Sequence, residues 1–249
     1  MRICVFDTET ISVDKPFCYN IGYVIYDTSN KAVLASNDFV VEQVWHNTML
    51  FNTAYYAEKK PLYVRRMRAR LTEMEKFGYI CQRMLREFRA YGVEAAFAYN
   101  SDFDERVFQF NCDWFKTSNP FDDVPVFDIR GHVHAFLVDE DYKDFCERES
   151  LFTESGNYST TAEAVYRFIT SNPLFEEEHT ALSDSQIEAA ILEECVKYGA
   201  EYASNYPVKR SIPREVPKQF RVKYNGMCVF TMDCRTIRYS KSKNEVLLK

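Results

Sequence analysis

Three strand-like segments at the start of the chain constrain its fold more than any other feature. Residues 2–7, 18–26 and 32–41 are rich in β-branched and aromatic side chains, which is typical of strands. Asp27-Thr28-Ser29-Asn30, between the second and third segments, has the composition of a turn. Helical and strand-like segments alternate after them, so we predict an α/β fold in which helices flank a mixed β-sheet.

The later elements are predicted from apolar periodicity and from helix-end signals. Apolar residues recur at helical spacing over residues 71–91, and Gly92 follows at an expected stop. Thr160-Thr161-Ala162-Glu163 is a capping-box pattern, and Ser183 or Asp184 is a candidate cap for the last long helix. The predicted helices are 52–70 with a break near Pro61, 71–91, 104–115, 130–137, 141–148, 162–170 and 184–203, and the predicted strands are 94–99 and 124–128.

The composition changes after Pro207. Three prolines precede two short strand-like pieces at 220–224 and 227–232, which the hairpin signal Asn225-Gly226 joins. For a chain of 249 residues we therefore predict a main domain at 1–204 and a small β appendage at 205–249.

Charge is divided unevenly between these two parts. Residues 205–249 contain eleven basic and three acidic residues, a net charge of +8, so the total of −6 leaves −14 for residues 1–204. A second basic cluster lies between Lys59 and Arg70. The asymmetry indicates an acidic body with basic arms for a polyanion, or a solvated basic tail.

Cysteine spacing and hydropathy indicate the compartment. The eight cysteines are scattered without a C-x-x-C pair, which favours buried free thiols in a reducing cytoplasm over disulfides or a zinc ribbon. Every apolar run is shorter than the ~20 residues of a membrane helix, and the N-terminus opens directly into strand-like sequence. We expect a cytoplasmic protein that does not enter a membrane, and its oligomeric state stays open.

Asp7 and Glu9 lie at the end of the first predicted strand. Residues two apart in a strand point to the same face, so their carboxylates converge. A divalent cation offsets the repulsion, and hard oxygen ligands favour Mg²⁺ or Mn²⁺. Two solvated loop residues are the alternative interpretation of this pair.

Two further stretches support a shared metal site. Asn100-Ser101-Asp102-Phe103-Asp104 follows a buried strand, and His179-Thr180-Ala181-Leu182-Ser183-Asp184 precedes a long helix. Taken singly, Asp104 and Asp184 are also good helix N-caps, and His179 is also a normal surface residue. One shared site accounts for all of these stretches together.

Together the patterns D-x-E, N-x-x-F-D and H-x₄-D resemble the three motifs of the DEDDh 3′–5′ exonucleases, which are DnaQ-like proteins with a ribonuclease H-like fold. The resemblance spans roughly residues 1–204 and is similar in texture to phage-encoded members. It implies the same fold, a nucleic acid with a free 3′ end as partner, and release of nucleoside 5′-monophosphates in the cytoplasm, that of the host if the protein is phage-encoded.

The resemblance also implies a role for each acidic residue. Two Mg²⁺ ions about 4 Å apart, for which Mn²⁺ can substitute, would clamp the scissile phosphate. Asp7 would bridge both ions, while Glu9 and Asp184 would hold the ion that binds the attacking water. Asp104 would support the second ion, and His179 would be the general base because its pKa lies near neutrality.

The substrate side of the site is assigned by the same resemblance. The residues expected to contact the terminal nucleotide are Thr10, Tyr99, Asn100 and Phe103. We expect single-stranded DNA as the substrate, with RNA and duplex ends left open.

Some nearby residues have two interpretations. Asp102 is an extra carboxylate beside Asp104, and we prefer Asp104 because it directly follows the phenylalanine, as in the family pattern. Asp128 resembles a supporting residue of the site and would equally well cap a helix. His132 lacks a third ligand at metal-binding spacing, so we interpret it as a surface or packing residue.

Two other functions fit parts of the sequence. The fold would also serve as a single-strand-binding module that does not cleave. A haloacid-dehalogenase-type phosphatase would begin with D-x-D-x-T, which Asp7-Thr8-Glu9-Thr10 resembles. Glu9 departs from that pattern, and the phosphatase scheme has no role for His179.

Overall fold

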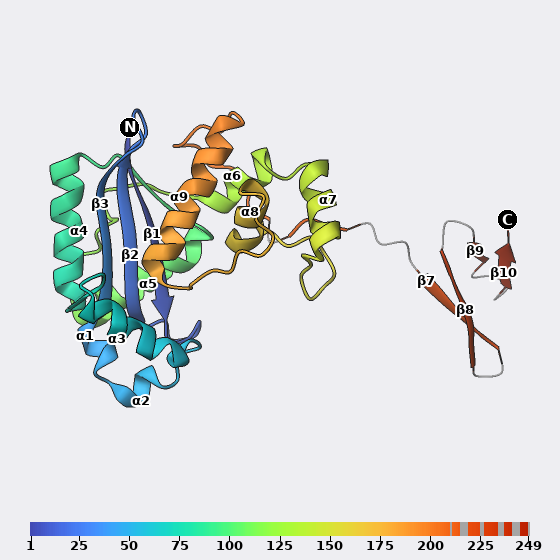
Figure 1. The fold of residues 1–249 in the computed structure, drawn as a ribbon, viewed down its shortest axis with the longest axis horizontal. Coiled ribbons are helices and arrows are strands. Elements are labelled where there is room, and N and C mark those ends of the chain that lie inside the picture. Colours follow the sequence, from blue (N-terminus) through green and yellow to red (C-terminus); the bar gives the residue numbers. More distant parts are fainter. Residues whose placement is uncertain (210, 215–218, 225–226, 234–236, 241–244, 249) are drawn as a thin grey trace.

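The computed structural model describes residues 1–209 and 211–214, and the backbone alone of the strands between residues 219 and 248. Its centre is a six-stranded sheet in the order β4-β3-β2-β1-β5-β6 (Figure 1). The strands are β1 (Arg2–Thr10), β2 (Cys18–Asp27), β3 (Ala32–Val41), β4 (Glu73–Glu75), β5 (Ala95–Ala98) and β6 (Val126–Asp128). β2 is antiparallel to both of its neighbours, and the other pairings are parallel. This arrangement confirms the predicted mixed α/β sheet.

Helices cover both faces of the sheet. They are α1 (Glu42–Trp45), α2 (Thr48–Phe51), the 3₁₀ helix η1 (Ala57–Lys59), α3 (Lys60–Arg68), α4 (Phe77–Tyr91), α5 (Ser101–Phe115), α6 (Ile129–Phe136), α7 (Glu140–Glu149), α8 (Ala162–Ile169) and α9 (Ala181–Lys197). Figure 1 shows α9 crossing in front of β1 and β2, and α1–α3 gathered near the end of β1.

The side chains of β1 alternate between two hydrophobic cores. Cys4 and Phe6 pack in the core that α4 and α5 complete, whereas Ile3 and Val5 pack in the core that α6 and α9 complete. All four are fully buried. Strand geometry requires this alternation, and it decides which helix each later residue of β1 faces.

The region after β3 differs from the prediction. Residues 52–70 do not form one helix, and Pro61 lies in the first turn of α3, where its missing N–H is not needed. The helix predicted over 71–91 begins only at Phe77, because Glu73–Glu75 pairs with β3 as a parallel edge strand. Leu71, which supported the longer helix, is 61% exposed.

Both helices that carry the acidic motifs begin earlier than predicted. α5 begins at Ser101 and α9 at Ala181, so Asp104 and Asp184 lie in first turns and the prediction of Asp184 or Ser183 as a cap is wrong. α9 also ends at Lys197, before the predicted residue 203. The N-terminal cap of α6 is Asp128, as expected from its residue type.

The C-terminal segment contains paired strands. β7 (Gln219–Tyr224) and β8 (Met227–Asp233) are antiparallel, as predicted, while the Asn225-Gly226 turn lies outside the described residues. β9 (Ile237–Ser240) and β10 (Glu245–Leu248) form a second antiparallel pair.

Residues just beyond the predicted boundary at 204 still pack on the main body. Ile212 pairs with Tyr158, and the Arg214 guanidinium forms an ion pair with Glu147. The division into 1–204 and 205–249 itself stays a prediction.

The structure describes the state of six cysteines and the length and apolar character of the helices. The six cysteines whose side chains are described are all free and buried. No helix in the described part of the chain combines the length and the apolar character that crossing a bilayer requires.

Candidate active site

Three carboxylates that lie far apart in the sequence, those of Asp7, Glu9 and Asp184, come together on one face of the sheet. We call them the acidic group. Asp7 and Glu9 belong to β1, and Asp184 belongs to the first turn of α9. One oxygen of each lies within 4.8 Å of an oxygen of the others. By strand alternation, Asp7 and Glu9 continue the row of Ile3 and Val5, which faces α9.

A glycine lets α9 approach the sheet at this point. Gly22 of β2 lies opposite Asp7 in the strand register. A Cβ atom at Gly22 would lie 2.0 Å from the Leu182 backbone nitrogen, so the backbones are in direct contact. The Ser185 hydroxyl donates a hydrogen bond to the Gly22 carbonyl at 3.0 Å. Any larger residue at position 22 would hold Asp184 away from β1.

A buried asparagine fixes the start of α9. Asn20 of β2 lies opposite Glu9, and its Oδ1 accepts hydrogen bonds from the Ala181 N–H at 2.8 Å and the Tyr63 hydroxyl at 3.0 Å. Its Nδ2 donates to Asp38 at 2.6 Å. In the described structure, the Thr180 side chain makes no capping hydrogen bond, so Asn20 satisfies the N–H of Ala181 at this buried end of the helix from the sheet.

The three carboxylates are electrostatically strained. Burial raises the pKa of Glu9 to about 8, and burial together with the Glu177 and Glu9 charges raises the pKa of Asp184 to about 8. Burial and the neighbouring Asp104 charge also raise the pKa of Asp7. Among the described residues, the buried Oδ1 of Asp184 has no hydrogen-bond partner. Such a donor set, made of oxygens that repel one another, fits a hard divalent cation.

Asp104 lies beside this group and not within it. Its Oδ1 accepts a hydrogen bond from the Thr8 hydroxyl at 2.6 Å, and its side chain is 3% exposed. Burial raises its pKa to about 7, although the bond from Thr8 opposes the shift. The neighbouring Asp102 is exposed, which favours Asp104 as the residue that belongs to the site.

Glu188 is a buried carboxylate that the sequence did not reveal. It lies one turn after Asp184 on α9, is 3% exposed, and accepts a hydrogen bond from the Tyr99 N–H at 3.2 Å. Burial raises its pKa, and the charges of Asp104 and Asp184 raise it further. Its spacing of four residues from Asp184 places both on one helix face, and that spacing was the available signal.

His179 occupies the loop before α9 in a left-handed backbone conformation, with φ of 50°. Its Nδ1 lies 3.5 Å from a Glu177 oxygen, and its ring stacks on Tyr56 with centroids 4.9 Å apart. Burial and the charge of Lys59 lower its pKa. His179 forms a close group with Glu163 and Glu177, separate from the group of Asp7, Glu9 and Asp184.

The predicted substrate contacts divide into free and occupied groups. Thr10 ends β1, where its hydroxyl donates weakly to the Ser12 carbonyl at 3.5 Å. The Tyr99 hydroxyl is occupied, because it donates to the Thr160 carbonyl at 2.7 Å. Asn100 and Phe103 line an open depression together with Asp102, Glu105 and Arg106.

Asp128 supports the loop that precedes Asp104. Its Oδ1 accepts hydrogen bonds from the Asn100 N–H at 3.0 Å and from the Arg130 N–H at 2.7 Å, so it serves both as the cap of α6 and as an anchor of this loop. His132 is a packing residue, since both of its ring nitrogens lie at hydrogen-bonding distance from backbone carbonyls, those of Asp128 and Tyr202 among them.

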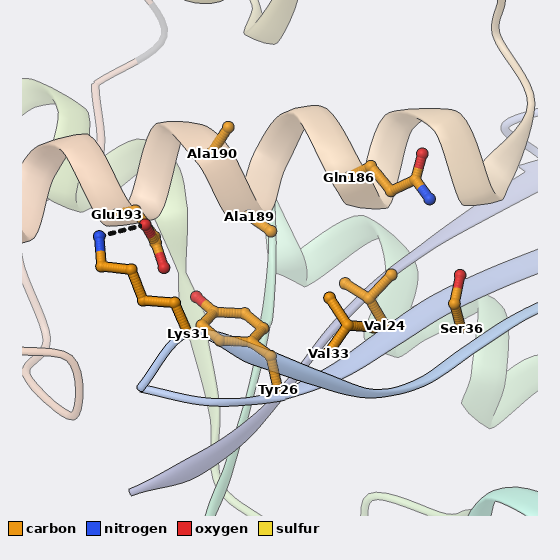
Figure 2. A pocket seen from close by; sticks show the side chains of 9 residues that line it. All are labelled: Val24, Tyr26, Lys31, Val33, Ser36, Gln186, Ala189, Ala190 and Glu193. Carbon is orange, nitrogen blue, oxygen red and sulfur yellow. Dashed lines mark hydrogen bonds and ion pairs between the residues drawn. The ribbon is translucent and has the colours of Figure 1, made fainter. Parts of the chain in front are cut away.

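A separate groove lies between α9 and the strands β2 and β3 (Figure 2). It encloses about 270 Å³ and is lined mainly by apolar side chains such as Val24 and Tyr26. An ion pair of 2.7 Å between Lys31 and Glu193 closes one end. None of its lining residues belongs to the acidic group, so we do not assign it to the same site.

Comparisons with solved structures bear on the fold. The chain is similar to E. coli exonuclease I in complex with a dA16 oligonucleotide, with a TM-score of 0.52 and 16% identity over 79% of this chain and 40% of that chain. It is similar to the same enzyme with a dT13 oligonucleotide, with a TM-score of 0.53 and 14% identity over 79% and 41% of the two chains. The nuclease domain of 3′hExo, a DEDDh family member bound to rAMP, gives a TM-score of 0.50 and 12% identity over 85% and 97%.

These likenesses define the fold. The chain has the DEDDh, ribonuclease H-like exonuclease fold, as its motifs predicted. It spans about 40% of the length of E. coli exonuclease I. No protein-family model and no curated protein sequence matches it.

Proposed function

We propose that the protein is a metal-dependent 3′–5′ exonuclease that removes nucleoside 5′-monophosphates from single-stranded DNA. The observation that carries the proposal is the convergence of Asp7, Glu9 and Asp184 within 4.8 Å of one another. The fold supports it, because the structures that this chain resembles are those of exonucleases, two of them with bound DNA oligonucleotides.

The acidic group would hold the metal. Asp7, Glu9 and Asp184 supply the oxygens, and Asp104 lies close enough to raise the pKa of Asp7 by its charge. Bound Mg²⁺ or Mn²⁺ would polarise the phosphate and neutralise the charge that develops during in-line displacement. The resemblance of the sequence motifs implies two such ions in the site.

In this proposal His179 is the general base that accepts the proton of the attacking water. Burial and Lys59 lower the pKa of its imidazole, which is therefore neutral and ready to accept a proton near pH 7. Its Nδ1 faces Glu177, so Nε2 is the atom that takes the proton from the attacking water. The water oxygen would then bond to phosphorus as the bond to the leaving 3′ oxygen breaks, and that oxygen would take a proton from solvent to become the new 3′ hydroxyl.

The test is a cleavage assay on labelled oligomers. DNA and RNA strands labelled at either the 3′ or the 5′ end are incubated with Mg²⁺, Mn²⁺ or a chelator. We expect stepwise shortening of 5′-labelled DNA with a metal and no shortening with the chelator. Binding without shortening would replace the proposal with a non-cleaving module, and release of phosphate from p-nitrophenyl phosphate alone would favour a phosphatase.

A substitution pair links the activity to the acidic group. Asp184→Asn removes one metal-binding charge while keeping the side-chain shape, and we expect the rate to fall at least about 100-fold. Asp113→Asn makes the same change at an exposed position of α5 and should leave the rate unchanged. Equal rates for the two variants would remove Asp184 from the site.

A further inference from the structure

The segment between β3 and β4 packs against the loop that carries His179. This segment includes Tyr55, Tyr56 and Lys59, which lie in and just before η1. None of the three motifs falls in it, and the sequence indicated only a broken helix over 52–70 and a basic charge. Figure 1 shows its helices near the end of β1, which is also the end that carries Asp7 and Glu9.

Tyr56 makes the most specific of these contacts. Its ring lies almost parallel to the His179 imidazole, with an interplanar angle of 16° and centroids 4.9 Å apart. The negative charges of Glu9 and Asp184 contribute to the raised pKa of Tyr56, after burial. The Tyr56 side chain therefore lies within electrostatic reach of two carboxylates of the acidic group.

Lys59 ties the same segment to the His179 loop. Its ammonium donates a hydrogen bond to the Glu178 carbonyl at 2.6 Å and lies 4.4 Å from the centre of the Tyr56 ring. Arg66 of α3 adds an ion pair of 3.3 Å to the Glu178 carboxylate. These contacts lie directly beside His179, whose backbone adopts a left-handed conformation.

We propose that Tyr56 is a positioning residue for His179. The inference rests on the proposed function, in which His179 takes the proton from water. A flat aromatic neighbour restricts the imidazole to one ring plane, and Glu177 at Nδ1 then fixes its rotation in that plane. With Tyr55 edge-on at 4.8 Å and Lys59 over the ring, other groups already contact Tyr56, so we assign it to His179 and not to a nucleobase.

Proton NMR tests the contact between Tyr56 and His179 independently of catalysis. The chain has four histidines, so each imidazole C2–H proton gives a resolvable signal, and His179→Ala identifies its own. Stacking on Tyr56 shifts the His179 signal upfield. We expect Tyr56→Phe to keep this shift and Tyr56→Leu to lose it. Tyr79→Leu, a matched change at an exposed position of α4, should leave the spectrum unchanged.

Kinetics test the positioning role. Tyr56→Leu should lower kcat about 10-fold with little change in KM, because an imidazole that is no longer held in one orientation contributes less to proton transfer. Tyr56→Phe should retain the wild-type kcat. In a His179→Ala background, Tyr56→Leu should not lower kcat any further. A raised KM with unchanged kcat would overturn the inference and make Tyr56 a substrate contact.

The two proposals fail in different ways. A wild-type protein that cleaves no oligomer would remove the proposed function, and with it the catalytic part of this inference, whatever the spectrum shows. An active wild-type protein whose kcat survives Tyr56→Leu, or whose His179 signal does not move in that variant, would overturn the positioning role alone.

Discussion

At the scale of single residues, the acidic group stores unfavourable electrostatic energy in the metal-free fold. The folded pKa is about 8 for Glu9, from an ordinary 4.5, and about 8 for Asp184, from an ordinary 3.8. A carboxyl whose folded pKa is raised binds its proton more tightly in the folded state. Its stabilising contribution is therefore complete below the unfolded pKa and is lost as the pH rises through the folded value.

This sign predicts the pH dependence of stability. Between pH 5.5 and 8.5 the melting temperature of the chelator-treated protein should fall by about 5–10 °C, which corresponds to a loss on the order of 2–3 kcal/mol. Mn²⁺ should recover most of the loss at high pH, and Asp184→Asn should flatten the profile. A chelated wild-type protein with the same pH profile as Asp184→Asn would contradict the assigned coupling.

The sequence revealed those site residues that occur at fixed spacing in short motifs. Asp7, Glu9 and Asp184 were candidates for this reason, although 175 positions separate the last two. Glu188 was not predicted as a site residue, because an acidic residue in a long helix normally faces solvent. Only the structure shows that it is buried. Tyr56 carries no sequence signal at all, since tertiary packing alone brings it to His179.

At the scale of elements, the site depends on one close contact between α9 and β2. Gly22→Ala would place a methyl group 2.0 Å from the backbone of Leu182, which cannot move without shifting the first turn of α9. We expect a destabilisation of roughly 1–3 kcal/mol or more from this overpacking. Asp184 should move with the turn, so the affinity for Mn²⁺ should fall as well.

Urea denaturation and calorimetric Mn²⁺ titration measure the two effects. Gly78→Ala is the matched control, because a Cβ there meets only ordinary contacts at 3.6 Å and the position is helical. It should leave Mn²⁺ binding unchanged and hold or slightly raise stability. If Gly22→Ala behaved like this control, the contact would not be what places Asp184.

The elements that the sequence misplaced are those that tertiary pairing decides. β4 is three residues long and exists as an edge strand on β3, so its apolar spacing could be read as helix. The start of α9 was misplaced because the acceptor that caps it is the side-chain oxygen of Asn20, which lies 161 residues away in the sheet. The long, strongly amphipathic α4 was found, although its first turn was placed too early.

At the scale of the whole molecule, charge separates the acidic body from the basic C-terminal segment. Arg214 pairs with Glu147 of the body, so residues up to 214 belong with the packed structure. Beyond it, residues 215–249 contain eight basic and three acidic residues, a net charge of +5, which leaves −11 for residues 1–214. A body with this net charge repels nucleic acid at long range, so the basic C-terminal segment would add to the attraction that the basic cluster between Lys59 and Arg70 provides.

Truncation at residue 214 tests this division of roles. Without residues 215–249 we expect weaker binding of single-stranded DNA and a plot of log K against log salt that is flatter by about 2–5, since fewer phosphates are neutralised. A full-length variant with the eight basic residues replaced by glutamine should match the truncation, because charge and not length is responsible. Binding is measured by fluorescence anisotropy with Ca²⁺ and Asp184→Asn to prevent cleavage. An unchanged salt slope would leave the segment as a solvated tail.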